Sequence, residues 1–261
     1  MTGDYTERGI FGAHGFLTER FVEGRRYLYP LPDALRTVGV LVEPLTIAEK
    51  GVRQYVSIQR RLPWLSGAGE DQILTGRRAV VLGAGPVGLL GAMLLRLRGC
   101  HVTVYSREAA DDPRADLARR MGARYLSGGE IPVAALPAET GAIDLVYEAA
   151  GSPALSLAVA GAMGPNGVFI LTGATGGGGR LEFGADAMLN HMVGRNVVVA
   201  GTVNASHADF VRAVDDLGRF AALWPEALDG IITSRHPLEE FASLALHRTG
   251  IKQVIDLDIR P

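Results

Sequence analysis

The sequence predicts an α/β protein built on a doubly wound parallel sheet of six strands. Apolar, β-branched segments of strand length alternate with segments of helical length between residues 78 and 204, which is typical of parallel sheets covered by helices on both faces. A G-x-G-x-x-G pattern, at Gly83, Gly85 and Gly88, joins the first strand to the first helix. The 261 residues are enough for one large or two small domains with a real core.

Composition and charge exclude several classes of protein. The formal net charge is −2, so there is no basic excess of the kind that binds nucleic acid or an anionic membrane surface. Apolar stretches are interrupted well short of a membrane span, and the polar N-terminus lacks the apolar core of a signal peptide. The single cysteine, Cys100, allows no intrachain disulfide, which suits the cytoplasm. We expect Cys100 to be a small buried hydrophobe rather than a nucleophile.

The residues before this pattern, 1–75, are expected to form a first unit that is too small to bury a core alone. Aromatic alternation indicates short strands and turns, and apolar residues at helical spacing after Pro44 indicate a long helix. The expected parts are strands and turns in 1–35, with alternation at Phe16, Phe21 and 27–31, a helix at 45–61 and a linking loop at 63–76.

The expected nucleotide-binding unit, 76–205, contains the six strands and the helices between them. In chain order its elements are strand 79–82, helix 86–97, strand 101–105, helix 113–121, strand 123–126, strand 142–151, helix 153–163, strand 167–175, helix 185–193 and strand 196–204. The stretch 127–140 is ambiguous. The last unit, 206–261, changes pattern, and we expect it to leave the sheet and return to the first unit. Its expected elements are a helix capped by Ser206 and ending at Phe220, strand 228–233, helix 237–246 and strand 251–257.

The glycine pattern has the context of a dinucleotide-binding fingerprint, because it lies between a strand and a helix that a second strand follows. Gly83 allows the tight turn, Gly85 lets the backbone approach a pyrophosphate, and Gly88 lets helix and strand pack closely. Pro86 and Val87 begin the helix whose N-terminus offers N–H groups to the phosphates. The alternative is an ordinary βαβ unit whose glycines serve only the turn; spacing, flanking strands and strand-end chemistry favour the dinucleotide.

The end of the second strand bears on which dinucleotide binds. NAD-binding proteins usually place Asp or Glu there for the ribose 2′-hydroxyl, whereas this sequence has Ser106 followed by Arg107. A neutral residue leaves room for a 2′-phosphate, and a guanidinium can pair with it. Glu108 can take the acidic role if the strand ends later, and Arg107 can be an ordinary surface charge. We favour NADP, with use of NAD possible.

Several stretches resemble the microbial glucose dehydrogenases that use NAD(P), within the medium-chain, zinc-dependent alcohol dehydrogenase superfamily. They are TERGIFGAHGF (6–16), VEPLTIAEK (42–50), VLGAGPVGLL (81–90), AGTVNA (200–205) and IKQVIDL (251–257). The resemblance implies a Rossmann domain at 76–205 and the remnant of a GroES-like β domain at 1–75. The family's catalytic zinc ligands, a Cys and a His-Glu pair, and its four structural-zinc cysteines have no counterpart in this sequence, which we expect to start just past those cysteines.

The resemblance also implies roles for single residues. Glu43 matches a zinc ligand of the family, or is a helix-start carboxylate stabilised by the dipole. Glu7 matches a carboxylate that contacts sugar hydroxyls, or is a surface residue. Asn204 matches a residue near the nicotinamide and the sugar, and would contact both. His191 is interpreted as a helix-surface residue.

Three further residues are candidates for cofactor contact because they lie at strand ends along the expected groove. They are Ala150, Thr172 and Gly173, and packing alone is the alternative. The activity implied by the resemblance is hydride transfer from the C1 hydroxyl of a sugar to NADP+, which zinc assists in the family by polarising that hydroxyl. A NADP-binding module without dehydrogenase activity is the alternative, because the zinc-bearing half is missing. Family members pair through the sheet edge, so a homo-oligomer is expected.

Overall fold

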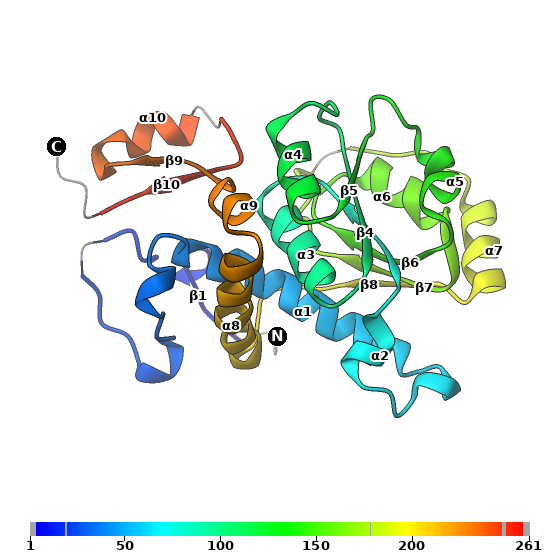
Figure 1. Cartoon of the computed structure of the whole chain (residues 1–261), viewed down its shortest axis with the longest axis horizontal. Coiled ribbons are helices and arrows are strands. Elements are labelled where there is room, and N and C mark those ends of the chain that lie inside the picture. Colours follow the sequence, from blue (N-terminus) through cyan, green and yellow to red (C-terminus); the bar gives the residue numbers. More distant parts are fainter. Residues whose placement is uncertain (1–3, 19, 178, 247–248, 258–261) are drawn as a thin grey trace.

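The computed structural model describes residues 4–257 apart from 19, 178, 247 and 248. Its centre is a six-stranded, all-parallel sheet, as predicted, and the strand order is β5-β4-β3-β6-β7-β8 (Figure 1). The order reverses between β3 and β6, which makes the carboxyl ends of these two strands the switch point where ligands bind in such sheets. The strands are β3 (Arg78–Leu82), β4 (His101–Ser106), β5 (Arg124–Ser127), β6 (Ile143–Glu148), β7 (Met163–Leu171) and β8 (Val198–Gly201).

Helices cover both faces of the sheet. Successive residues of a strand point to opposite faces, so each buried strand places apolar side chains in the core on both sides. Within β3, Val81 packs in one buried cluster and Val80 and Leu82 in the other. On the first face, the helix that carries Gly91 can pack closely against the sheet because Gly91 faces the ring of Tyr147. A Cβ at position 91 would lie 2.5 Å from that ring. The helices between the strands are α3 (Pro86–Leu97), α4 (Pro113–Arg120), α5 (Leu136–Thr140), α6 (Pro153–Ala160) and α7 (Ala185–Arg195).

The elements outside the sheet pack against its first face or lie beside it. Helix α1 crosses beneath the sheet next to α8, and β9 and β10 form a separate two-stranded parallel sheet near the N-terminal segment (Figure 1). As predicted, the tail does not extend the main sheet. These elements are β1 (Glu7–Arg8), β2 (Gly12–Ala13), α1 (Val42–Gln59), α2 (Glu70–Leu74), α8 (His207–Leu223), α9 (Pro225–Asp229), β9 (Ile232–His236), α10 (Phe241–Leu246) and β10 (Lys252–Ile255).

Several secondary-structure predictions were wrong. The loop predicted at 63–76 contains α2, and the strand predicted at 228–233 begins only at Ile232, because Pro225–Asp229 form α9. The alternation at Phe16, Phe21 and 27–31 forms no strand in the described residues; Phe16 and Phe21 contact each other at the surface with tilted rings, whose centroids are 4.6 Å apart. The helix predicted at 153–163 ends at Ala160, and β7 begins at Met163 rather than at Gly167. The cause is packing, since Met163 pairs with Ile143 of β6 and is buried there.

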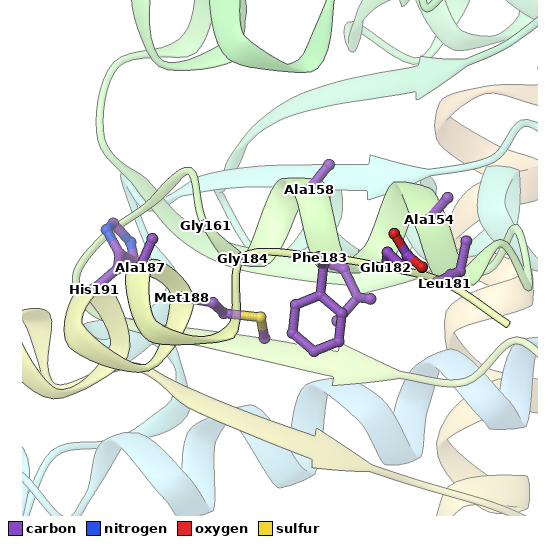
Figure 2. A pocket seen from close by; sticks show the side chains of 11 residues that line it. Ala154, Ala158, Gly161, Leu181, Glu182, Phe183, Gly184, Ala187, Met188 and His191 are labelled. Carbon is purple, nitrogen blue, oxygen red and sulfur yellow. The ribbon is translucent and has the colours of Figure 1, made fainter.

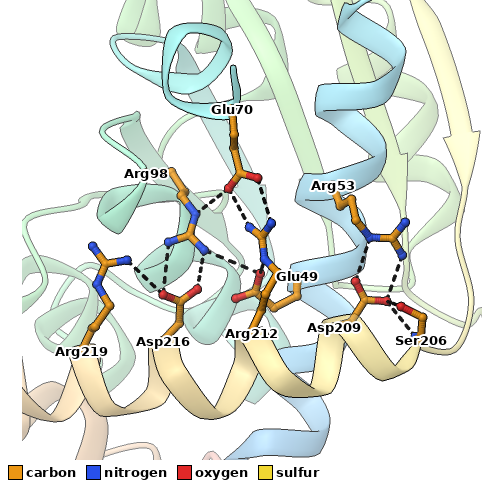
Figure 3. Close-up of polar contacts among 9 residues, drawn as sticks. All are labelled: Glu49, Arg53, Glu70, Arg98, Ser206, Asp209, Arg212, Asp216 and Arg219. Atoms are coloured by element: carbon orange, nitrogen blue, oxygen red, sulfur yellow. Dashed lines mark hydrogen bonds and ion pairs between the residues drawn. The ribbon is translucent and has the colours of Figure 1, made fainter. Parts of the chain in front are cut away.

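A network of charged side chains fastens α8 to α1, α2 and α3 (Figure 3). Arg212 of α8 donates to Glu49 of α1 at 2.9 Å and to Glu70 of α2 at 2.6 Å. Arg98, just after α3, donates to Glu70 at 2.8 Å and pairs with Asp216 of α8. Glu49 is fully buried, and burial together with the nearby Asp216 raises its pKa to about 8. Arg219 adds a bond to Asp216, and a separate group beside the network joins Arg53 of α1 to Asp209 and Ser206 at the start of α8.

Candidate functional site

The turn between β3 and α3 has the geometry that the fingerprint requires. Gly83 has φ +95°, in the region that favours glycine, and a Cβ there would lie 3.2 Å from the backbone of Ala149 and Ala150. A Cβ on Gly88 would lie 2.0 Å from the carbonyl oxygen of Gly83, so only glycine fits. Around Gly85 a Cβ would meet nothing within 4 Å. The turn is therefore tightly packed on its protein side and open at Gly85, which fits the approach of a pyrophosphate.

The N-terminus of α3 faces the same opening. Gly85 is the N-cap and has no side chain to cap the first turn, and Pro86 occupies the first helical position. Val87 follows and is half-buried, while the rest of the helix down to Leu95 is buried. A helix with an uncapped N-terminus directs N–H groups and a positive dipole end to the opening, which suits an anionic group such as a diphosphate.

The carboxyl end of β4 adds a hydroxyl and a carboxylate to the opening. Ser106 is buried, accepts the N–H of Ala84 at 3.1 Å, and donates its hydroxyl to Glu108. Partial burial opposes ionisation of Glu108, but the hydrogen bond from Ser106 outweighs it together with nearby arginines and holds the pKa of Glu108 below its usual range. The side chain of Arg107 is 93% exposed and pairs with Glu108 at 3.4 Å. The structure thus brings Ser106 to the fingerprint turn and places Arg107 at the surface, paired with Glu108.

The carboxyl ends of β6 and β7 meet next to the fingerprint turn. Ala150 lies against Gly83, and Gly173 lies against Gly151. Between these loops is a residue that the sequence reasoning missed, Glu148, whose carboxylate accepts backbone N–H groups from both. A glutamate that ends a buried apolar strand and precedes Ala-Ala-Gly was the available signal, since a buried carboxylate requires hydrogen-bond donors.

The residues predicted to bind substrate and metal lie on or beside three separate elements. Asn204 lies just beyond β8, half-buried, with φ +59°, a conformation in which Asn is enriched. Glu43 is exposed in the first turn of α1, and Glu7 is half-buried in β1. No group of three or more His, Cys, Asp or Glu residues that could hold a metal ion occurs within the described parts of the chain. Within those parts, Glu43 has no companion ligands, so the described residues do not fit a zinc site.

Two of the hollows next to the nucleotide-binding unit lie beside the start of α3 and beside α6 and α7. One, of about 410 Å³, lies between Pro86 at the start of α3 and the residues of α10 and β10, including Lys252. The other, of about 550 Å³, lies between α6 and α7, away from the fingerprint turn, and is lined mainly by small and apolar side chains (Figure 2). His191 lines this second hollow and contacts the carbonyl of Met163 at 3.0 Å. Of the two, the hollow at Pro86 is the one that adjoins the proposed phosphate position.

Fold and site together define a doubly wound α/β protein with a dinucleotide-type turn at its switch point. The chain belongs to the family described as "Glucose dehydrogenase C-terminus", which it matches over residues 36–257. It is 35% identical to the glucose 1-dehydrogenase of Methanocella arvoryzae over 90% of this chain and 63% of that protein. It is 36% identical to the glucose 1-dehydrogenase of Metallosphaera sedula over 99% of this chain and 70% of that protein.

A solved structure gives the same result for the fold. Glucose dehydrogenase of Haloferax mediterranei, in complex with NADP, Zn and gluconolactone, matches with a TM-score of 0.86 and 30% identity over 100% of this chain and 70% of that one. The chain therefore spans about two thirds of the length of these relatives. The predicted family is confirmed, and so is the predicted six-stranded fold.

Proposed function

We propose that this chain binds NADP as part of a glucose dehydrogenase-type oxidoreductase, which transfers hydride from C1 of glucose or a related sugar to NADP+ while the C1 hydroxyl loses its proton and a lactone forms. The observation that carries the proposal is the turn at Gly83, Gly85 and Gly88, closed on its protein side and open at Gly85. The relatives named glucose 1-dehydrogenase support the sugar, and the solved relative with NADP supports the cofactor.

Each part of the site has one task in this proposal. Gly85 and the first turn of α3, with Pro86 and Val87, receive the pyrophosphate. Ser106 fixes the strand end beside the adenosine ribose, through its bond to the N–H of Ala84. A bound nicotinamide supplies the hydride acceptor. The backbone at Ala150 and in the loop after β7 positions the nicotinamide half, with Thr172, Gly173 and Asn204 as the remaining proposed contacts.

The choice between NADP and NAD depends on Arg107 and Glu108. The guanidinium of Arg107 is exposed on a flexible side chain, so it can turn to a 2′-phosphate and form a bidentate pair. Glu108 is held ionised beside Ser106, where it can accept a hydrogen bond from a ribose 2′-hydroxyl but repels a 2′-phosphate. We propose that NADP is preferred and that NAD also binds.

Substrate, metal and assembly are further parts of the proposal. Glu7 and Asn204 would contact sugar hydroxyls, and Glu43 would contribute to a metal site only together with ligands that the described residues do not supply. Copies of the chain would pair along β8, the edge strand of the sheet, beside which Leu189 and Val193 of α7 are exposed. In the described part of the chain, no helix has the length and apolar character that crossing a membrane requires. We propose a cytoplasmic location.

The division of the chain remains part of the proposal as well: 1–75 as the catalytic-domain part, 76–205 as the nucleotide-binding domain and 206–261 as the returning segment. In the structure, buried residues of all three contribute to one core, among them Leu41, Val81 and Leu217. The proposed division is therefore one of evolutionary origin and function rather than of separate cores.

The test is an assay on the purified full chain. NADP+ reduction is followed with glucose and with added zinc, and NADPH binding is measured in parallel by calorimetry. Turnover with glucose and tight NADPH binding are expected if the chain carries the whole activity. Binding without turnover would support the alternative, a NADP-binding module. Absence of NADPH binding would contradict both.

A further inference from the structure

Glu148 is a buried carboxylate at the centre of the carboxyl edge of the sheet. It is the last residue of β6 and only 1% exposed. A carboxylate in such a place is costly unless hydrogen bonds replace the water that it loses. None of the cofactor contacts proposed above includes it, so its position requires a separate explanation.

The partners of Glu148 are three backbone N–H groups from two different loops. Its Oε1 accepts the N–H of Ala150 at 2.8 Å and that of Gly151 at 2.6 Å, both in the loop from β6 to α6. Its Oε2 accepts the N–H of Gly173 at 3.0 Å, in the loop after β7. The hydroxyl of Thr172 adds a bond to the Glu148 carbonyl at 2.6 Å. One side chain therefore joins the ends of β6 and β7.

The two loops pack closely at their junction, where neither Gly173 nor Gly151 has space for a side chain. A Cβ on Gly173 would lie 2.5 Å from the nitrogen of Gly151 and 2.7 Å from Oε2 of Glu148. Gly151 has φ +63°, and a Cβ there would lie 2.5 Å from the carbonyl oxygen of Ala174. The two loops are in direct backbone contact around the carboxylate, so a change in its bonding must move at least one of them.

The strand order decides which half of a dinucleotide these loops face. Ser106 is the last residue of β4 and Arg107 follows it, both beside the adenosine ribose in the proposal, and the pyrophosphate turn follows β3. Strands β6 and β7 lie on the other side of β3. A dinucleotide that crosses the switch point from β4 must place its other half, the nicotinamide, over the ends of β6 and β7.

We infer that Glu148 is a positioning residue for the nicotinamide half of the cofactor. It acts through the backbone of Ala150, Gly151 and Gly173, which it holds at fixed positions beside the ring. Its hydrogen-bond partners lie in the loops after β6 and β7 and not at the end of β4, so its contribution to affinity should be confined to ligands that carry nicotinamide. This inference rests on the proposed binding of NADP.

The substitution that tests it is Glu148→Gln. Because all three partners are donors, the glutamine carbonyl can keep Ala150 and Gly151, and its NH2 group then faces the N–H of Gly173. The β7 loop then loses its bond to the side chain at Gly173, while Thr172 keeps its bonds to the backbone carbonyl of residue 148. The affinity of the full chain for NADPH should fall about tenfold, equivalent to about 1.4 kcal/mol. The affinity for 2′-phospho-ADP-ribose, which lacks the nicotinamide, should remain unchanged. Both are measured by calorimetry.

Two further variants keep the result decisive. Glu239→Gln changes an exposed glutamate and should change neither affinity. Gly173→Ala disturbs the same junction from the other side and should show the same selective loss, so it replaces Glu148→Gln if that variant does not fold. Thermal unfolding is recorded for each, because a purely structural role would lower the melting temperature and weaken both ligands alike.

The outcomes separate the inference from the proposed function. A selective loss of NADPH affinity supports the positioning role. Equal losses for both ligands, or no loss for either, overturn the positioning role and leave cofactor binding intact. A wild-type chain that binds neither ligand overturns the proposed function and this inference with it.

Discussion

The carboxyl edge of the sheet and the N-terminal segment, residues 4–34, differ in how strongly their residues are held. At the sheet edge, Gly83 and Gly88 have no space for a side chain, and Ser106 is buried in a hydrogen-bonded position. In the segment, Phe11 is 59% and Val22 95% exposed. The glycines of the fingerprint and Ser106 are thus fixed by packing within the chain itself. The predicted sugar contact, Glu7, lies in the loosely packed segment, and the predicted metal ligand, Glu43, is an exposed side chain on the well-packed helix α1.

The largest expected effect is that of Gly85→Val. The side chain would enter the space that the pyrophosphate needs, while the surrounding protein leaves room for it, so the sheet should stay folded. NADPH affinity should fall about a hundredfold or more, about 2.7 kcal/mol. Calorimetry measures the loss, and circular dichroism checks the fold.

Gly67→Val is the matched control, because Gly67 also has nothing within 4 Å of a Cβ but lies in the loop before α2. It should bind NADPH like the wild type. If Gly85→Val also kept wild-type affinity, the proposal that the pyrophosphate binds at Gly85 would be wrong.

The next effect concerns the adenosine side. Arg107→Asp replaces the group that can pair with a 2′-phosphate by one that repels it, and the ratio of NADP to NAD affinity should fall at least about tenfold. Glu108→Gln should move the same ratio in the opposite direction, because it removes the carboxylate beside Ser106. Arg195→Asp, at an exposed position in α7, is the control. Unchanged ratios in both test variants would show that the end of β4 does not select the cofactor.

A smaller effect tests how α8 is joined to the sheet region. The pKa of Glu49 is raised to about 8 in the folded protein, above its value in the unfolded chain, so the folded state binds more protons between these values. Stability from this group therefore falls as pH rises from about 5 to about 8. Glu49→Gln keeps an acceptor for Arg212 and removes the charge.

The difference in unfolding free energy between Glu49→Gln and the wild type should thus increase with pH, by about 1 kcal/mol or more between pH values of about 5 and 8.5. Urea unfolding at several pH values measures it. The other charges that face Glu49, Arg98 and Asp216, are common to both proteins and cancel in the difference. A difference independent of pH would mean that Glu49 is ionised throughout.

The smallest expected effect is that of Glu43→Gln. Glu43 is exposed and makes at most a dipole interaction in the first turn of α1, worth up to about 1 kcal/mol. NADPH affinity should equal that of the wild type. A loss of more than about threefold, about 0.65 kcal/mol, would bring the first turn of α1 into the cofactor site.

What could be predicted from the sequence follows the range of the interactions involved. The helix Pro86–Leu97 has the predicted bounds, because its start and stop depend on neighbouring glycines and proline. Ser106 was found from its spacing after the fingerprint, but not its bond to Ala84, since the two residues are 22 apart and meet only through the pairing of β3 and β4. Glu148 was missed for the same reason, because one of its donors, Gly173, is 25 residues away.

The predictions for the N-terminal segment had less physical support. Alternating aromatic residues specify a strand only when a partner strand and a core are present to bury one face. Phe16 instead contacts Phe21 and lies under the guanidinium of Arg8, and both rings stay exposed. Cys100 shows the opposite case. It is fully buried, as predicted, and burial raises the pKa of its thiol to about 12, so it is not a nucleophile at neutral pH.

The central claim is that the carboxyl edge of this sheet binds a nicotinamide dinucleotide, and calorimetric titration of NADPH into the full chain tests it most directly. We predict saturable binding with one site per chain, lost in Gly85→Val and retained in Gly67→Val. An absence of binding to the folded wild-type chain, or equal binding to the wild type and Gly85→Val, would contradict the account.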